Sequence, residues 1–212
     1  MRIGIIGGTG SFGKGLAIRL SATNQVLIGS RNRNKGEDTA TQVKATIGRD
    51  VTGGLNEDMA NACDVAILAI ANLNDAGFLE PLKEPLRGKI VISPIVPMRL
   101  DKGLLVTSGA QGSAAEEVGL VLKESKVVAA LHHIPALTMM KADWRVDFDV
   151  LTACDSKADY EEAAAIIRSI EGLRPLYVGP LFMSRVLESM TPLLINTARL
   201  NKLNRLSLKL VS

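Results

Sequence analysis

Residues 3–15 read IGIIGGTGSFGKG, and this stretch decides the fold. Three of its glycines have the G-x-G-x-x-G spacing, directly after the apolar run RIGII and directly before a segment of helical length. In a strand–turn–helix unit the first glycine permits a tight turn, the second lets the backbone approach a pyrophosphate, and the third allows close packing of helix on strand. The pattern predicts a dinucleotide-binding unit rather than a merely structural turn. The expected pyrophosphate contacts are Gly8, Thr9, Gly10, Ser11, Phe12 and Gly13.

The second apolar run ends in IGSR, and this ending distinguishes between the two nicotinamide dinucleotides. An NAD site carries Asp or Glu here, because the carboxylate accepts hydrogen bonds from the ribose 2′-hydroxyl. In this chain Ser30 offers a hydroxyl and Arg31 a planar fork suited to phosphate. Lys35 or Arg33 adds a further cation. A solvated basic loop is the alternative, but the position after the second strand favours a 2′-phosphate clamp, so the sequence predicts NADP.

Short apolar runs alternate with amphipathic segments of helical length over the first 140 residues, the pattern that produces parallel βαβ units. Runs such as VAILAI and VVAAL are apolar throughout, as strands covered on both faces should be. The expected strands are Arg2–Ile6, Gln25–Ile28, Val65–Ile70, Lys89–Ile92 and Val127–Leu131. The expected helices are Phe12–Ser21, Arg33–Ile47, Ala76–Pro85 and Ser113–Glu124.

After about residue 140 the pattern changes. A long final helix is expected to open at Gly179-Pro180, since Pro is tolerated in a first turn, and Pro192 is expected to kink it. Its apolar residues recur at spacings of three and four, so its stripe either packs on the sheet or faces another copy of the chain. The elements expected before it are a strand over Phe148–Ala153, a helix over Lys157–Ile170 and a strand over Pro175–Val178.

The predicted fold class is α/β: a Rossmann-like doubly wound parallel sheet with a small C-terminal α/β and long-helix appendage. We expect residues 1–140 to form the NADP-binding Rossmann domain. Residues 141–212 form the small C-terminal region with its strands and long helix.

The composition restricts the class of partner and the compartment. It argues against a nucleic-acid-binding surface. The chain has only one Trp, two Tyr and four Phe on which bases could stack, its cations are scattered, and its net charge is +3. No stretch without charged residues reaches the ~18 residues of a membrane span. The apolar strand at Ile3 leaves no room for a cleavable signal peptide. Cys63 and Cys154 lie far apart in apolar contexts, so we expect both to be reduced in a cytoplasmic protein.

A second substrate should meet the nicotinamide at the carboxyl ends of the strands. Three loops lie there, at residues 71–73, 93–97 and 132–136, and none pairs a nucleophile with a base. Neither Tyr160 nor Tyr177 falls in them, which argues against ordinary carbonyl reduction. The loops predict an apolar slot for two stacked flat heterocycles, between which hydride transfer needs no catalytic acid or base.

His132 and His133 stand next to each other in the third loop. Adjacent residues point to opposite sides of an extended segment, so the pair is poorly placed to bind one metal ion. We expect no metal site, and a role for both residues in the wall of the pocket.

Five motifs carry a resemblance to a known family: GGTGSFGKGLAIRL, IGSR followed by Lys35, KIVISPIVP, VVAALHHIPA and GLRPLYVGPLFMSRVLESMTPLLIN. They resemble the coenzyme-F420-dependent NADP oxidoreductases across nearly the whole chain. The late motifs are more specific than the glycine loop, which many families share. The resemblance implies reversible hydride transfer between reduced coenzyme F420, an 8-hydroxy-5-deazaflavin, and NADP.

The resemblance also implies a cytoplasmic homodimer and a set of site residues, with no catalytic acid or base. The C-terminal region, residues 141–212, would carry the deazaflavin site and the dimer contacts. Ser30, Arg31 and Lys35 would hold the 2′-phosphate. Ile70, Val96 and Ala136 would border the nicotinamide, and the deazaflavin would stack near Ile134 and Pro135.

One departure from the family lies after the run VAILAI. Members commonly carry Pro-Trp there, whereas this chain has Ala71-Asn72, with Asn72 expected among the cofactor contacts. Losing the flat Trp wall changes the pocket, so other hypotheses stay open. One is an NADPH-dependent reductase of another acceptor, a flavin or a ferric complex. The other is a non-catalytic NADPH-sensing module.

Overall fold

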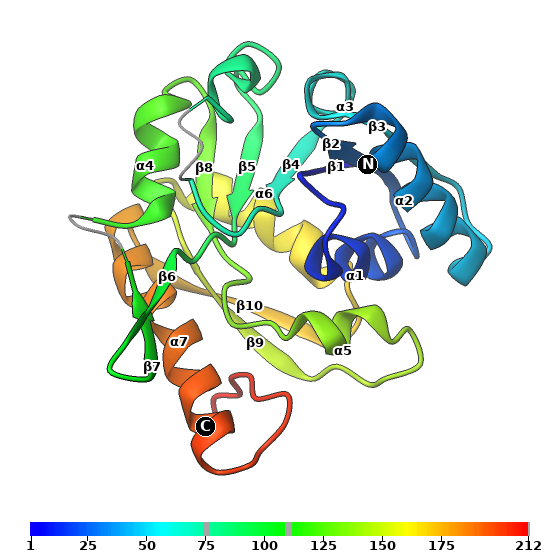
Figure 1. Cartoon of the computed structure of the whole chain (residues 1–212). Helices are drawn as coiled ribbons and strands as arrows, with labels where there is room; N and C mark the ends of the chain where they lie inside the picture. The colour runs from blue at the N-terminus through cyan, green and yellow to red at the C-terminus, as the bar shows by residue number, and fades with distance from the viewer. Residues whose placement is uncertain (74–76, 109–111, 212) are drawn as a thin grey trace.

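The computed structural model describes residues 1–73, 77–108 and 112–211, and an eight-stranded sheet organises them (Figure 1). The strand order is β10-β9-β8-β5-β4-β1-β2-β3. The strands from β8 to β3 are parallel, and β9 and β10 are parallel to each other but antiparallel to β8. The strands are β1 (Arg2–Ile6), β2 (Gln25–Ser30), β3 (Val51–Leu55), β4 (Val65–Leu68), β5 (Ile90–Ser93), β8 (Lys126–Ala129), β9 (Phe148–Ala153) and β10 (Leu173–Gly179).

Helices cover both faces of this sheet. They are α1 (Ser11–Leu20), α2 (Arg33–Ile47), α3 (Asn56–Ala62), α4 (Ala114–Val121), α5 (Ala136–Met140), α6 (Lys157–Arg168) and α7 (Ser184–Leu200), with 3₁₀ turns η1 (Glu80–Leu82) and η2 (Leu181–Met183). A separate hairpin, β6 (Met98–Asp101) and β7 (Leu104–Thr107), lies beside α7 (Figure 1).

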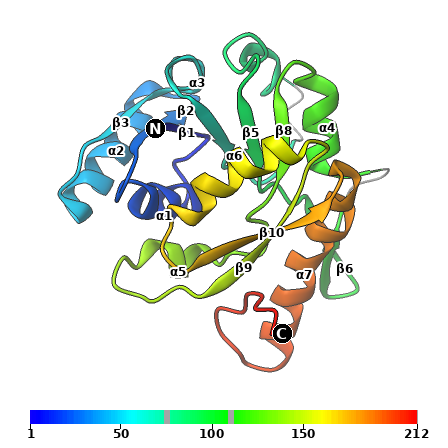
Figure 2. The same ribbon diagram turned by 180° about the vertical axis from the view of Figure 1, so that it is seen from behind.

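Alternate strand residues enter two different cores. Ile3 and Ile5 of β1 pack with α1, α2 and α6 on one face, while Ile6 packs with α3, η1 and α4 on the other. Accordingly α6 lies behind the sheet in Figure 1 and in front of it in Figure 2. Two buried faces explain why the strands are apolar at every position. The predicted doubly wound class is confirmed.

All seven predicted strands form, with ends shifted by a few residues, while β3 and the hairpin strands β6 and β7 were not predicted. Of these three, β3 lies beside the predicted nucleotide site. Its sequence VTGGL has low strand propensity because of its two glycines. The structure explains them: a Cβ on Gly53 would lie 2.2 Å from the carbonyl oxygen of Gly36 in α2, and one on Gly36 would lie 2.5 Å from that of Gly54. The glycines let α2 pack directly on β3.

The predicted helix over Ala76–Pro85 is wrong. Of its residues that the structure describes, only Glu80–Leu82 are helical, as the 3₁₀ turn η1, and Ala76 lies outside the described residues. Pro81 and Pro85 lack the N–H groups that a continuous helix needs, so the segment forms turns instead.

Beyond residue 140 the chain continues the same sheet through β9 and β10, then α7 runs without interruption past Pro192. Residues 202–211, here called the C-terminal segment, fold back from the end of α7 (Figure 1). Its backbone reaches β9, because Asp149 N–H donates to the Leu208 carbonyl at 2.9 Å. None of the helices in the described residues has the length and hydropathy to cross a bilayer.

Candidate functional site

A cavity of about 590 Å³ lies at the carboxyl ends of β1 to β4, and we call it the glycine-loop cavity. These strands are parallel, so the residues that end or follow them meet at one edge of the sheet. Gly7 follows β1, Ser30 ends β2, Asn56 follows β3 and Ala69 follows β4. Predicted site residues that line this cavity together are Thr9, Gly10, Ser30, Arg31, Lys35, Ile70 and Asn72.

The glycine loop has the geometry of an anion cradle. Gly8 N–H donates to the Gly29 carbonyl at 3.0 Å, which fixes the loop to the end of β2. A Cβ on Gly13 would lie 2.4 Å from the Gly8 carbonyl oxygen, so this glycine lets α1 approach the loop. Gly10 is the N-cap of α1, no side chain caps it, and a Cβ there would meet nothing within 4 Å. The first amides of α1 are therefore left for an anion.

Ser30 and Lys35 lie together at the start of α2. Ser30 is buried, and its Oγ accepts from the Asn32 N–H at 3.3 Å. Asn32 caps α2 by accepting from the Lys35 N–H at 3.2 Å. Arg33 instead forms an ion pair with Asp58 at 2.7 Å and does not line the cavity, so position favours Lys35 as the second cation. The described residues that line this cavity include no Asp or Glu.

Asn56 is a site residue that sequence reasoning missed. Its Oδ1 accepts from the Gly7 N–H at 2.9 Å, and its side chain lines the cavity. A Cβ on Gly29 would lie 2.7 Å from the same oxygen, so Asn56 joins the ends of β1, β2 and β3. The sequence signal for Asn56 is its place directly after a strand, and this signal can be used only once β3 has been recognised as a strand.

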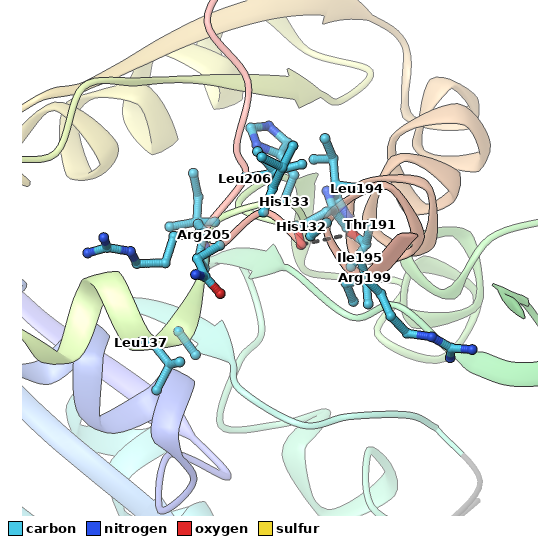
Figure 3. A pocket seen from close by; sticks show the side chains of 15 residues that line it. His132, His133, Leu137, Thr191, Leu194, Ile195, Arg199, Arg205 and Leu206 are labelled. Carbon is cyan, nitrogen blue, oxygen red and sulfur yellow. Dashed lines mark hydrogen bonds between the residues drawn. The ribbon is translucent and has the colours of Figure 1, made fainter. Parts of the chain in front are cut away.

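A second cavity, of about 480 Å³, opens beyond the end of β8, and we call it the His132 cavity (Figure 3). One wall is the segment His132–Leu137, which contains the predicted residues Ile134, Pro135 and Ala136. The opposite wall is α7, and the C-terminal segment closes a third side. The side chains that α7 and the C-terminal segment contribute include Thr191, Leu194, Ile195, Leu203 and Leu206.

Some predicted site residues line neither cavity. Val96 is buried with 7% exposure, and Gly8 and Gly13 are buried in the glycine loop. Ser11 and Phe12 belong to the first turn of α1, where Ser11 is exposed. Ile70 and Ala136, both expected at the nicotinamide, line different cavities.

The two histidines do not point to opposite sides, which corrects the sequence expectation. Leu131 has a φ of 68° and the chain turns at residues 132–133, so both side chains line the same cavity. His133 Nδ1 lies 3.1 Å from Ser207 Oγ of the C-terminal segment. The His132 carbonyl accepts from Thr191 Oγ1 at 2.9 Å (Figure 3).

The His132 ring is buried and neutral. Burial lowers its pKa to about 3, and neither ring nitrogen has a hydrogen-bond partner in the described part of the chain. Such nitrogens are unusual in a folded protein and are available to a bound molecule. Within the described residues, no three His, Cys, Asp or Glu side chains gather as a metal site would require.

Arg19 links the two cavities through α1 and α5. Its guanidinium donates to the carbonyls of Thr138 at 3.1 Å, Met139 at 3.3 Å and Trp144 at 2.8 Å, and also to Lys141. These carbonyls lie at and beyond the end of α5, whose start forms part of the His132 cavity. The glycine loop leads into the start of α1, so Arg19 fixes α5 against the far end of the helix that begins at this loop.

Comparisons with known proteins identify the family of this chain. The family profile described as NADP oxidoreductase, coenzyme F420-dependent, matches residues 2–97. The chain is 37% identical to the F420-dependent NADP reductase of Methanocaldococcus jannaschii, over 92% of this chain and 91% of the relative. It is 34% identical to the protein of that name from Methanothermobacter thermautotrophicus, over 100% of this chain and 95% of the relative.

The fold is similar to that of solved structures at lower identity. A crystal structure of a proposed F420-dependent NADP-reductase from Arthrobacter sp. FB24 matches with a TM-score of 0.85 and 21% identity, over the full length of both chains. An imine reductase from Bacillus cereus matches with a TM-score of 0.67 and 16% identity, over 95% of this chain and 63% of that one. From the identity to the full-length relatives, the chain belongs to the coenzyme-F420-dependent NADP oxidoreductase family.

Proposed function

We propose that this protein transfers a hydride reversibly between NADP and coenzyme F420. The observation that carries the proposal is the placement of two cavities at one sheet edge, joined through α1 and α5, in a chain of this family. One cavity has the features of a dinucleotide site, and the other has apolar walls suited to a flat ring. The nicotinamide supplies the hydride and the deazaflavin accepts it at a carbon atom, so the protein's task is to hold and orient the two.

The residues of the glycine-loop cavity fit NADP. The uncapped amides of α1 suit the pyrophosphate, and Ser30, Arg31 and Lys35 suit a 2′-phosphate. A carboxylate in this place would repel that phosphate, and none of the described lining residues has one. We assign the remaining predicted contacts, Ile70 and Asn72, to the nicotinamide side of the same site.

The residues of the His132 cavity fit the deazaflavin ring. Ile134, Pro135 and Ala136 offer an apolar wall, and Leu194 and Ile195 face them from α7. The unpartnered ring nitrogens of His132 offer hydrogen bonds to the polar edge of the ring. No side chain has to move a proton at the reacting carbon.

The departure at Ala71-Asn72 falls in the glycine-loop cavity and not in the His132 cavity. It therefore changes the nucleotide side of the site and leaves the proposed acceptor wall intact. The departure therefore gives no structural reason to replace the deazaflavin by another acceptor, and the family membership of the chain favours the deazaflavin.

The experiment mixes the protein with NADPH and coenzyme F420 and follows the absorbance of the deazaflavin. Loss of that absorbance supports the proposal. Reduction of free flavin with no change in F420 would contradict the proposal and favour an NADPH-dependent flavin reductase. Tight NADPH binding without turnover of any acceptor would favour a non-catalytic NADPH-sensing module.

The cofactor choice has its own test. Arg31→Ala or Ser30→Asp should raise KM for NADP by about 10- to 100-fold, because each removes a charge-assisted contact or adds a repelling carboxylate. KM for NAD should change little. Equal losses for both dinucleotides would contradict the 2′-phosphate clamp.

We also propose that the protein is a homodimer whose copies meet at α7. Val186, Leu193 and Leu200 recur every seven residues and are 56%, 63% and 66% exposed, and Phe182 continues the stripe at 54%. Heptad spacing of this kind is typical of helix–helix contacts. The dimer contact and two walls of the His132 cavity would then belong to the C-terminal region, residues 141–212. Light scattering of Leu193→Glu should show a monomer, while Val211→Glu, at a residue that is 94% exposed and outside α7, should not change the mass.

A cytoplasmic location is part of the proposal. Cys63 and Cys154 are both buried and unpaired, which suits a reducing compartment. A reduced thiol count of two after isolation under non-reducing conditions supports this assignment, and a mixed disulfide on either cysteine contradicts it.

A further inference from the structure

A third cavity, of about 460 Å³, adjoins the His132 cavity, and we call it the Trp144 cavity. Asn204 and Arg205 of the C-terminal segment line both cavities and form the boundary between them. Leu137 of α5 lines the His132 cavity, and the next residue, Thr138, lines the Trp144 cavity. A molecule seated against Ile134 and Pro135 therefore has a second compartment next to it.

The Trp144 cavity is polar and carries two guanidinium groups. Arg145 and Arg205 line it, and neither forms an ion pair within the described residues. Asp143 also lines it, so the formal charge of the lining is +1. Other arginines of the described residues pair with a carboxylate: Arg174 pairs with Asp149, and Arg185 pairs with Glu116.

The Arg205 guanidinium is held in place. It lies over the Trp144 ring, with its central carbon 4.0 Å from the ring centroid, and this cation–π contact restricts where the guanidinium can move. Figure 3 shows Arg205 extending from the C-terminal segment on the side of the His132 cavity opposite to Arg199. Its backbone has a φ of 58°, a conformation that non-glycine residues adopt rarely.

A buried hydroxyl without a partner is the independent sign of a ligand. Thr138 is 4% exposed and lines the Trp144 cavity, and its Oγ1 has no hydrogen-bond partner in the described part of the chain. Buried polar atoms are almost always satisfied, so this hydroxyl is set to donate to an atom that the protein does not supply. Two guanidinium groups and this hydroxyl outnumber the one carboxylate of the lining, Asp143, and such an excess of donors suits an anionic oxygen.

We propose that the Trp144 cavity is a subsite for an anionic group, phosphate or carboxylate, carried on the side chain of the hydride acceptor. The inference rests on the proposed function, since it places the acceptor's ring in the adjoining His132 cavity. The anion belongs to the acceptor and not to NADP, because the dinucleotide's phosphates are accounted for by α1 and by Ser30, Arg31 and Lys35 on the glycine-loop cavity. A free inorganic anion has the same chemistry, and the test separates the two sources.

The test compares two deazaflavins by equilibrium dialysis against the full-length protein saturated with NADP. One is coenzyme F420, which carries a phosphate and glutamate carboxylates, and the other is 8-hydroxy-5-deazariboflavin, which has the same ring and no anionic group. We expect the wild-type protein to bind coenzyme F420 about tenfold more tightly, as a partly exposed charged contact allows.

Arg145→Gln should weaken F420 binding about fivefold and leave the tail-free deazaflavin unchanged, because this arginine lines only the Trp144 cavity. Thr138→Val keeps the shape of the side chain and should show the same selective loss. Arg49→Gln removes an exposed arginine without a described ion pair and should bind both molecules like the wild type. Thermal midpoints of all variants check that each is folded.

Three results would overturn the subsite: equal affinity of the wild type for both deazaflavins, an equal loss of both in Arg145→Gln, or an effect as large in Arg49→Gln. The cavity would instead belong to a free anion under two conditions. Both deazaflavins bind equally, and inorganic phosphate raises the thermal midpoint of the wild type but not of Arg145→Gln. Failure of the proposed function looks different: coenzyme F420 binds selectively but NADPH does not reduce it. If neither deazaflavin binds, both proposals fall.

Discussion

The glycine-loop cavity and the His132 cavity lie at the same edge of one sheet but are built in different ways. The first consists mostly of residues at or just after the ends of parallel strands, and its proposed pyrophosphate donors are backbone amides at the start of α1. The second consists of His132–Leu137 and, much later in the chain, part of α7 and the C-terminal segment that follows it. Its walls are side chains, and their positions depend on contacts elsewhere in the molecule.

This difference teaches where each site is vulnerable. Backbone recognition tolerates many side-chain changes but not a Cβ at the wrong glycine, because the ligand approaches the main chain itself. A side-chain pocket tolerates local changes in its lining but depends on the groups that anchor its walls. In this protein those anchors are Arg19, which fixes α5, and Asp149, which fixes the C-terminal segment.

The largest effect should come from a Cβ in the glycine loop. Gly10→Val adds a side chain where the structure has nothing within 4 Å, so the fold should keep its thermal midpoint. The same side chain occupies the space of the pyrophosphate, so NADPH affinity should fall by about 100-fold or more, measured by isothermal titration.

Gly13→Val is the matched comparison. Its Cβ would lie 2.4 Å from the Gly8 carbonyl oxygen, so this variant should lose stability as well as NADPH binding. If Gly10→Val were as unstable as Gly13→Val, the loss of nucleotide would reflect unfolding, and the idea that the ligand needs the space at Gly10 would fail.

A smaller effect, on the other cavity, should follow from Arg19→Met. Removing the guanidinium leaves the carbonyls at the end of α5 without donors, which should cost about 2–4 kcal/mol of unfolding free energy by urea titration. Coenzyme F420 binding should weaken because α5 starts with residues of the His132 cavity, while NADP affinity stays within about twofold. Arg19→Lys keeps a donor at this place and should therefore retain part of the stability and part of the F420 affinity. If Arg19→Met lowered the affinity for NADP more than the affinity for F420, the idea that Arg19 supports only the side-chain pocket would be wrong.

The same difference explains how much could be predicted from the sequence. The glycine loop, Ser30, Arg31 and Lys35 could be predicted to lie at one cavity because short-range patterns, a strand and then a turn of defined spacing, specify their places. Asn56 was missed because the glycines of β3 hide a strand whose existence depends on close packing against α2. The turn at Leu131 that brings both histidines to one cavity has no local signal, since a positive φ at a Leu is imposed by tertiary contacts.

The arrangement around the His132 cavity could not be read from the sequence for a related reason. Arg19 donates to four carbonyls more than a hundred positions along the chain, and residue spacing carries no information about such contacts. The C-terminal segment has no periodic pattern, and its place is set by hydrogen bonds to β9. The resemblance to a family supplied Ile134, Pro135 and Ala136, which composition and periodicity alone did not single out.

The smallest predicted effect concerns the anchor of the C-terminal segment. Asp149 is fully buried and accepts from Arg174 and from the Leu210 N–H at 2.7 Å. The Arg174 hydrogen bonds lower the pKa of Asp149 to about 2, below its ordinary value of 3.8. Since the folded-state pKa is depressed, this carboxylate stabilises the protein fully above about pH 4, and the contribution is lost as the pH falls toward 2.

Asp149→Asn should therefore lower the thermal midpoint by about 2–4 °C at pH 7, with a smaller difference from the wild type at pH 3. It should also expose residues 202–211 to limited proteolysis and weaken F420 binding without affecting NADP, because the released segment lines the His132 and Trp144 cavities and not the glycine-loop cavity. The control is Asp147→Asn, whose carboxylate pairs with Lys209 of the same segment at 2.5 Å but is 58% exposed, so its loss should change little. Equal effects of the two substitutions would show that the segment is held by general charge attraction, and that the buried Asp149 contact has no special part in shaping the pocket.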